Sequence, residues 1–186
     1  MLMTRTSTKK AVLVIDVWDD HWDRETKEYL PSLADSINSF LKSVRGKWTI
    51  IHSPSECDIK FEYKIHEKYR AADSPPSAYF TRVTGKKVWG GIHPNIDVED
   101  GDYVTNWAPQ IFSILANHKV ENVYLVGLHL DACIMDKPMG AQNLREFGFN
   151  PIVVEDLTET LFMDKEDVIS KIKKDYKICK TSKIIQ

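Results

Sequence analysis

One stretch, residues 122–160, constrains the fold of this chain more than any other. It opens with an apolar run at residues 123–126 that stops at Gly127, and it closes with a second apolar run at residues 152–154. Between the two runs, apolar residues recur at helical spacing, starting from Cys133. This order predicts a strand, a sharp turn, a helix and a second strand parallel to the first.

The rest of the chain repeats this alternation of strands and helices. Further strands are predicted at residues 11–15, 48–51, 103–105 and 176–179, the last at a sheet edge. Amphipathic helices are predicted at residues 26–44, from residue 109 and from residue 164, and one continuous helix is predicted from Cys133 to Phe147. We therefore expect an α/β fold, a three-layer sandwich with a central, mostly parallel six-stranded sheet of the Rossmann-like kind.

Composition narrows the function classes. The chain has 186 residues and a formal net charge of −2, without the basic excess expected for binding nucleic acid. No apolar run approaches the ~20 residues of a membrane span, and the first residues lack the apolar core of a signal peptide. Three widely spaced cysteines fit no disulfide framework, so we expect a cytoplasmic protein. We expect a disordered tail at residues 1–10, one domain at 11–186, and a lid or binding loop within 56–94.

Polar side chains follow three of the predicted strands. Asp16, His52 and Cys133 come after the strands at residues 11–15, 48–51 and 123–126. The carboxyl ends of parallel strands are where such sheets bind ligands. Cys133 would be a nucleophile there, because a helix N-terminus lowers a thiol pKa. The alternatives are a buried structural cysteine, a loop-capping aspartate and a hydrogen-bonded structural histidine.

Three segments of the chain resemble the isochorismatase-like cysteine hydrolases, a superfamily that includes nicotinamidases and N-carbamoylsarcosine amidases. They read AVLVIDVWDD, GGIHPNIDVEDGDYV and VGLHLDAC…GAQNLREFGFNPIVVEDLTET, and span most of residues 11–160. A closer likeness is to an uncharacterised bacterial branch with the patterns DxWDxHW, IIHxPS and GVHTNxC, which here read DVWDDHW, IIHSPS and GLHLDAC. The resemblance implies the isochorismatase-like hydrolase fold.

The resemblance also implies roles for particular residues. Cys133 would attack an amide-like carbon and Asp16 would handle its proton. A cis peptide at Leu128–His129 would let the N–H groups of His129 and Cys133 form an oxyanion hole. The function expected is hydrolysis of a small amide, carbamoyl or related C–N bond through a covalent Cys133 intermediate.

One departure from the family pattern opens an alternative. The family lysine at the end of the third strand corresponds to Asn106, which we take as the catalytic candidate there. His52, His129 or Lys137 could supply the missing cation, and His52 is the side chain that we expect near the thiol. If none does, the protein is a catalytically silent relative that acts as a binding or interaction module. Leu130 also replaces the usual threonine of the cysteine turn.

The remaining expectations concern ligands and partners. Substrate-binding candidates are Trp18, His21, His52, Tyr63, Trp107 and Leu128. We expect no cofactor. We also expect no metal, because the D-x-H motif of nicotinamidases is missing after His52, and His52, His93 and His129 show no ligand spacing. The expected partners are a small-molecule substrate and further copies of the chain, as a dimer or tetramer, without nucleic acid or membrane.

Overall fold

The computed structural model describes residues 9–54 and 90–185. Six strands form one sheet in the order β3-β2-β1-β4-β5-β6, and all neighbouring strands are parallel. Their bounds are β1 Lys9–Ile15, β2 Thr49–Ser53, β3 Tyr103–Val104, β4 Val120–Leu128, β5 Asn150–Glu159 and β6 Lys177–Cys179. The predicted six-stranded α/β sheet is confirmed, with β6 at one edge.

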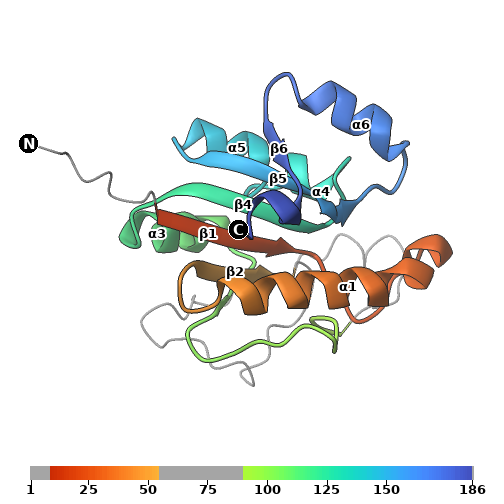
Figure 1. Ribbon diagram of the computed structural model, residues 1–186, viewed down its shortest axis with the longest axis horizontal. Coiled ribbons are helices and arrows are strands. Elements are labelled where there is room, and N and C mark those ends of the chain that lie inside the picture. The colour runs from red at the N-terminus through yellow and green to blue at the C-terminus, as the bar shows by residue number, and fades with distance from the viewer. Residues whose placement is uncertain (1–8, 55–89, 186) are drawn as a thin grey trace, which may run out of the picture.

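Helices cover both faces of this sheet, as Figure 1 shows. The helices are α1 Arg24–Val44, α3 Ala108–Asn117, α4 Cys133–Asp136, α5 Ala141–Glu146 and α6 Lys165–Ile172, followed by the 3₁₀ turn η2 Thr181–Lys183. Apolar residues of α1 pack on one face. Those of α3, α4, α5 and α6 pack on the other. The predicted three layers are therefore present.

The central strand β1 shows why its sequence is an uninterrupted apolar run. Leu13 and Ile15 belong to the core on the α3 side. Val12 and Val14 belong to the core on the α1 side. Side chains alternate between the two faces of a strand, so a strand covered on both faces needs apolar residues at every position.

The helix predicted from Cys133 to Phe147 is broken in the structure. α4 ends at Asp136 and α5 begins at Ala141. Lys137 has φ −64° and ψ 159°, the extended conformation imposed on a residue that precedes a proline, here Pro138. Phe147, the last apolar residue of the predicted helix, lies beyond α5 and is 64% exposed.

Strand β5 is longer than predicted. The apolar run that predicted this strand ends at residue 154, but the strand continues to Glu159. Pairing with β4 shifts its register between Leu125 and Gly127, which lets β5 follow β4 to its end. Tyr63, most of the predicted lid and most of the predicted tail lie outside the described residues.

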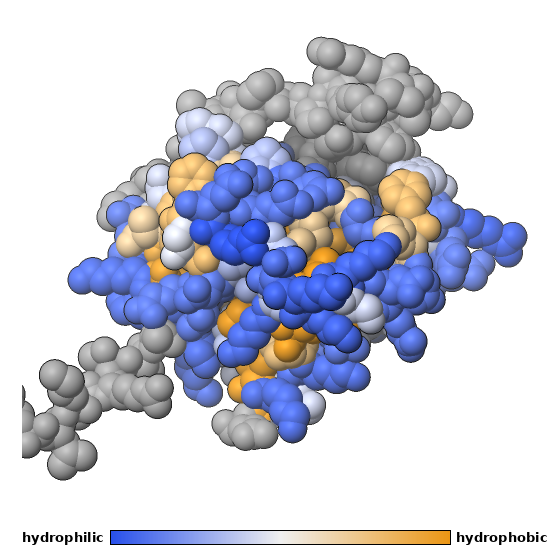
Figure 2. Space-filling view, turned by 90° about the horizontal axis from the view of Figure 1, so that it is seen from above, coloured by the Kyte–Doolittle hydropathy of each residue, from blue (hydrophilic) through white to orange (hydrophobic). Residues whose placement is uncertain are grey.

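The surface seen from above is mostly hydrophilic, with hydrophobic residues in small separate areas (Figure 2). None of the helices among residues 9–54 and 90–185 is long and apolar enough to cross a membrane.

Candidate active site

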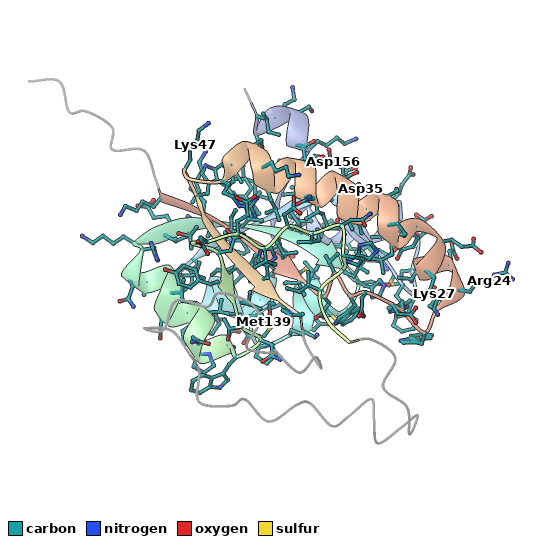
Figure 3. The ribbon with its side chains drawn as sticks, turned by 90° about the horizontal axis from the view of Figure 1, so that it is seen from below. Arg24, Lys27, Asp35, Lys47, Met139 and Asp156 are labelled. Atoms are coloured by element: carbon teal, nitrogen blue, oxygen red, sulfur yellow. The ribbon has the colours of Figure 1, made fainter. Side chains whose placement is uncertain are left out.

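The candidate site lies at the carboxyl edge of the sheet. In Figure 3, Arg24 and Lys27 mark the end of α1 at this edge, and Lys47 marks the opposite edge. Asp16 directly follows β1 and is fully buried. Its φ of 54° is left-handed, a conformation that aspartate tolerates better than most residues. Its N–H donates to the Ser53 carbonyl oxygen at 3.2 Å, which holds the carboxylate at the end of the central strand.

Gly127 brings the cysteine turn close to this carboxylate. Its φ is +111°, and a Cβ atom there would lie 2.0 Å from the carbonyl oxygen of Ile15. Only glycine fits both conditions. β4 can therefore run tightly against the end of β1, and the chain enters the Cys133 turn beside Asp16.

The peptide bond between Leu128 and His129 is cis, as the resemblance implied. The N–H of His129 donates to the Cys133 sulfur. Within the described part of the chain, no backbone carbonyl accepts the N–H of either His129 or Cys133. Both donors therefore suit the oxyanion hole that the resemblance implies, and that role stays a prediction.

Lys137 supplies the cation of the site. Its ammonium forms an ion pair with the Asp16 carboxylate, and it lies 5.8 Å from the ring centroid of Trp18. The α4–α5 break holds its backbone, because its carbonyl accepts the Gly140 N–H at 2.7 Å and the Asn143 amide at 3.0 Å. The proline that breaks the predicted helix thus also positions the lysine.

The electrostatics of Cys133 differ from the sequence expectation. Burial and the charge of Asp16 raise the pKa of the thiol to about 12, against the lowering influence of Lys137 and of the His129 N–H. The predicted lowering is wrong for two reasons: α4 has only four residues, and the half-buried Cys133 lies beside the Asp16 carboxylate. Cys133 therefore rests as a thiol that donates a hydrogen bond to Asp16.

His52 does not serve the thiol as expected. Its Nε2 lies 3.1 Å from the Asp102 carboxylate, which Arg45 also binds at 2.7 Å. The neighbouring residue Ile51 packs in the core on the α3 side, where Cys133 also packs. Because side chains alternate along a strand, His52 faces the α1 side. It belongs to a buried polar cluster with Asp102 and Arg45.

The other predicted substrate-binding residues have different settings. Trp18 and His21 are buried beside each other, with ring centroids 5.7 Å apart. Trp107 is 44% exposed at the start of α3. The Leu128 side chain is completely buried in the core against α1, which does not support a role in contacting substrate.

Asn106 does not supply the missing charge. Its amide donates a long hydrogen bond of 3.5 Å to the Pro54 carbonyl. The cation paired with Asp16 comes instead from Lys137, on the other side of Cys133 in the sequence. Two signals pointed to Lys137: its place one turn after the cysteine and the proline that follows it.

No three His, Cys, Asp or Glu side chains within residues 9–54 and 90–185 converge so as to hold a metal ion. The three histidines weighed as possible metal ligands, His52, His93 and His129, contact different residues. His52 pairs with Asp102, His93 Nδ1 accepts the Asn95 N–H at 3.1 Å, and His129 packs against His21.

A family model described as the Isochorismatase domain matches residues 10–174, which is most of the chain. The chain belongs to the isochorismatase family. No curated protein sequence matches it. The match covers Asp16, the cysteine turn and Lys137, so the whole candidate site lies within the isochorismatase domain.

Solved structures of this family share the fold at low identity. An isochorismatase-like hydrolase from Alkaliphilus metalliredigens is 16% identical, with a TM-score of 0.66, 96% of this chain and 98% of that chain covered. The N-carbamoylsarcosine amidase from Thermoplasma acidophilum is 15% identical, with a TM-score of 0.67, and the comparison covers 94% of this chain and 97% of that chain. A nicotinamidase/pyrazinamidase from Bacillus subtilis is 14% identical, with a TM-score of 0.64, and the comparison covers 93% of this chain and 100% of that chain. Each comparison spans nearly the full length of both chains, so the architecture is shared as a whole.

Proposed function

We propose that this protein hydrolyses a C–N bond of a small amide or carbamoyl compound through a covalent intermediate on Cys133. One observation carries the proposal: the buried Asp16 carboxylate binds both the Cys133 thiol and the Lys137 ammonium. A nucleophile joined to a base that a third group orients is the arrangement that covalent catalysis requires. Family membership and the amidases among the structural relatives agree with it.

The first half-reaction forms the covalent intermediate. Asp16 accepts the thiol proton while the Cys133 sulfur bonds to the carbonyl carbon. The carbonyl oxygen becomes an oxyanion, which the N–H groups of His129 and Cys133 stabilise, each worth about 3 kcal/mol when aimed at the developing charge. Asp16 then returns the proton to the nitrogen, the C–N bond breaks, and an amine leaves behind a thioester.

The second half-reaction restores the enzyme. Asp16, again ionised, takes a proton from water as its oxygen bonds to the thioester carbon. The same two N–H groups stabilise the second oxyanion. The carbon–sulfur bond then breaks, the proton passes from Asp16 to the sulfur, and an acid leaves. Lys137 keeps the carboxylate in place and balances its charge through both halves.

The ion pair between Asp16 and Lys137 bears on the alternative that the protein is catalytically silent. That alternative rested on Asn106 in place of the family lysine, which left no cation beside the thiol. Lys137 fills the electrostatic role from the α4–α5 break, since a cation ~4 Å from an anion is worth about 4 kcal/mol at an effective dielectric near 20. The reason for expecting silence is thereby removed, and hydrolysis is the better supported function.

The test is turnover of a panel of small amides and carbamoyl compounds, followed by release of ammonia or amine. Mass spectrometry of the intact protein should find an acyl group on Cys133 under turnover. We expect Cys133→Ser and Lys137→Met each to lower kcat/KM at least about 100-fold. Lys165→Met is the matched control, because Lys165 pairs with Glu159 at 2.8 Å and is 27% exposed, against 24% for Lys137. Full activity of Lys137→Met, or of Cys133→Ser, would overturn the proposal.

A further inference from the structure

A cavity lies at the amino edge of the sheet, opposite the edge that carries Asp16 and Cys133. Its volume is about 690 Å³, within the ~300–1,000 Å³ that is usual for small-molecule sites. The start of β1, the connection from α1 to β2, the segment before β3 and the end of α3 all line it. Lys47, which Figure 3 labels at this edge, is one of the lining residues. The cavity is therefore separate from the candidate active site.

Three lysines of the cavity carry charges that no carboxylate compensates. Lys9 and Lys10 begin β1, and Lys47 follows the end of α1. Within residues 9–54 and 90–185, none of these three ammonium groups forms an ion pair with a carboxylate. The chain as a whole has a formal net charge of −2, so this positive charge is a local excess. Positive charge gathered around a hollow attracts anions.

The acidic residues of the lining leave this excess in place. The Asp102 carboxylate is engaged by Arg45 at 2.7 Å and by His52 at 3.1 Å. It also accepts the Glu99 N–H at 3.2 Å. The other acidic residue of the lining, Asp100, is exposed. One exposed carboxylate opposes three lysines, so the cavity keeps a net positive charge.

The wall of the cavity is fixed by contacts between its segments. Arg45 joins the end of α1 to the segment before β3, because it binds Asp102 and donates to the Asp97 carbonyl at 2.8 Å. The Tyr103 hydroxyl lies 2.6 Å from His118 Nε2, which joins β3 to the end of α3. A site that is already assembled loses little conformational freedom when a ligand binds.

Trp48 gives the cavity an apolar side next to the lysines. It lines the cavity and packs against Tyr124, with ring centroids 4.6 Å apart. The Lys10 ammonium lies 4.8 Å from the centroid of the Trp48 ring. Lys10 is thus held by an aromatic ring, which attracts a cation without neutralising its charge. The matching ligand has an anionic group joined to an apolar part.

We propose that this cavity binds a phosphate monoester of a small organic molecule. The phosphate lies among Lys9, Lys10 and Lys47, and the organic part lies against Trp48. A phosphate monoester carries about two negative charges near neutral pH and three acceptor oxygens, which suits three ammonium groups better than a singly charged carboxylate does. Binding in this cavity does not depend on the hydrolysis proposed at Cys133.

The test is isothermal titration calorimetry of the full chain with phenyl phosphate, at about pH 7.5 and about 0.15 M ionic strength. Phenyl sulfate is the matched ligand, because it has the same ring and a single negative charge. We expect saturable binding of phenyl phosphate, at least about tenfold tighter than that of phenyl sulfate. If phenyl phosphate does not bind, or if the two ligands bind equally, the proposal is overturned.

Two triple variants separate the cavity from the overall charge, because each removes three positive charges. The cavity variant carries Lys9→Met, Lys10→Met and Lys47→Met. The control variant replaces three exposed lysines in and after α6, Lys171→Met, Lys173→Met and Lys174→Met. We expect the cavity variant to bind phenyl phosphate at least about tenfold more weakly and the control to change less than about twofold. An equal loss in both variants would refute the site.

A second measurement uses the unchanged chain and stays decisive if the cavity variant does not fold. Acetylation of each lysine is followed by peptide mass spectrometry with and without phenyl phosphate. We expect the ligand to slow acetylation of Lys9, Lys10 and Lys47 in proportion to its occupancy. The exposed lysines of the control variant should react at an unchanged rate. Unprotected cavity lysines at a saturating ligand concentration would show that the ligand binds elsewhere, and the proposal would be wrong.

Discussion

At the scale of single residues, Asp16 has two opposite effects on Cys133. Its negative charge, added to burial, raises the pKa of the thiol and so keeps the sulfur protonated. The same carboxylate is the base that removes this proton when a substrate arrives. The thiol therefore stays neutral in the resting site and loses its proton only as the substrate reacts. Lys137 pairs with the Asp16 carboxylate, so that this buried charge is not left unpaired.

This double role predicts that Asp16→Asn separates ionisation from turnover. Removing the negative charge should lower the pKa of Cys133 below its value of about 12, because the charge opposes thiolate formation. Turnover should nevertheless fall at least about 100-fold, because the base is lost. The ultraviolet absorbance of the thiolate, titrated from about pH 7 upward with Cys133→Ser as blank, gives the first quantity. An unchanged or higher thiol pKa would show that Asp16 does not govern the sulfur.

A second prediction at this scale exchanges the lysine between two positions. The resemblance to the family predicts that Asn106 occupies the position of the family lysine, whereas Lys137 forms the ion pair with Asp16. In a Lys137→Met background, Asn106→Lys should recover about tenfold in kcat/KM, since part of the ~4 kcal/mol of ion pairing returns. Asn106→Lys alone is the control and should bring no gain, because Asp16 is already paired. Failure of the double variant to exceed Lys137→Met would mean that position 106 does not reach the carboxylate.

At the scale of elements, the sequence predicted the positions of the buried strands but missed the break between α4 and α5. The apolar runs at β1 and β4 identified two buried strands, because fully covered strands need apolar residues at every position. The α4–α5 break was missed because the apolar spacing continues through Pro138, and spacing alone does not reveal where a proline ends a helix. Lys137 was consequently only one of three cations that the sequence offered. His52 was expected at the thiol, but the alternation of β2 directs it to the other face.

The close approach of β1 and β4 predicts a large effect for Gly127→Ala. A Cβ there would lie 2.0 Å from the Ile15 carbonyl oxygen, so the two central strands would have to separate. Gly101→Ala is the matched control, because Gly101 also has a positive φ, +98°, but open space around its Cβ position. We expect Gly101→Ala to cost about 1 kcal/mol in the free energy of unfolding. Gly127→Ala should cost at least about 2 kcal/mol more.

Urea unfolding of the two glycine variants measures this difference. Both variants carry the same cost of a left-handed alanine, so the difference isolates the contact between the strands. Equal unfolding free energies would mean that the Ile15 carbonyl can move aside without cost. The approach of β4 to β1 would then not be what brings the cysteine turn to Asp16.

At the scale of the whole molecule, sheet order explains how the site is assembled. Asp16 and Lys137 lie 121 positions apart in the chain, yet β1 and β4 are neighbours at the centre of the sheet. The carboxyl ends of these two strands therefore deliver the base, the nucleophile turn and the lysine to one place. Alternating strands and helices were enough to predict this meeting point. The partner of each side chain depended on backbone geometry at Asp16, Gly127 and Lys137, which a pattern of apolar residues does not encode.

Buried histidines make the stability of the whole molecule depend on pH. Burial lowers the pKa of His129 from 6.5 to about 4 in the folded protein, and burial also lowers the pKa values of His21 and His93. Between pH 6.5 and about 4, the unfolded chain binds a proton at His129 that the folded chain does not. Stability should therefore fall as the pH drops through this window, by up to about 3 kcal/mol from His129 alone.

Urea unfolding of the wild type and of His129→Gln at several pH values checks this: the variant should lose less stability across the window, because its carboxamide does not titrate. Burial raises the pKa of the Asp102 carboxylate, but the hydrogen bonds from His52 and Arg45 together outweigh burial and hold this pKa below 3.8. Protonation of Asp102 therefore weakens the fold only below this window. Parallel curves for the two proteins between pH 6.5 and about 4 would show that folding does not lower the pKa of His129.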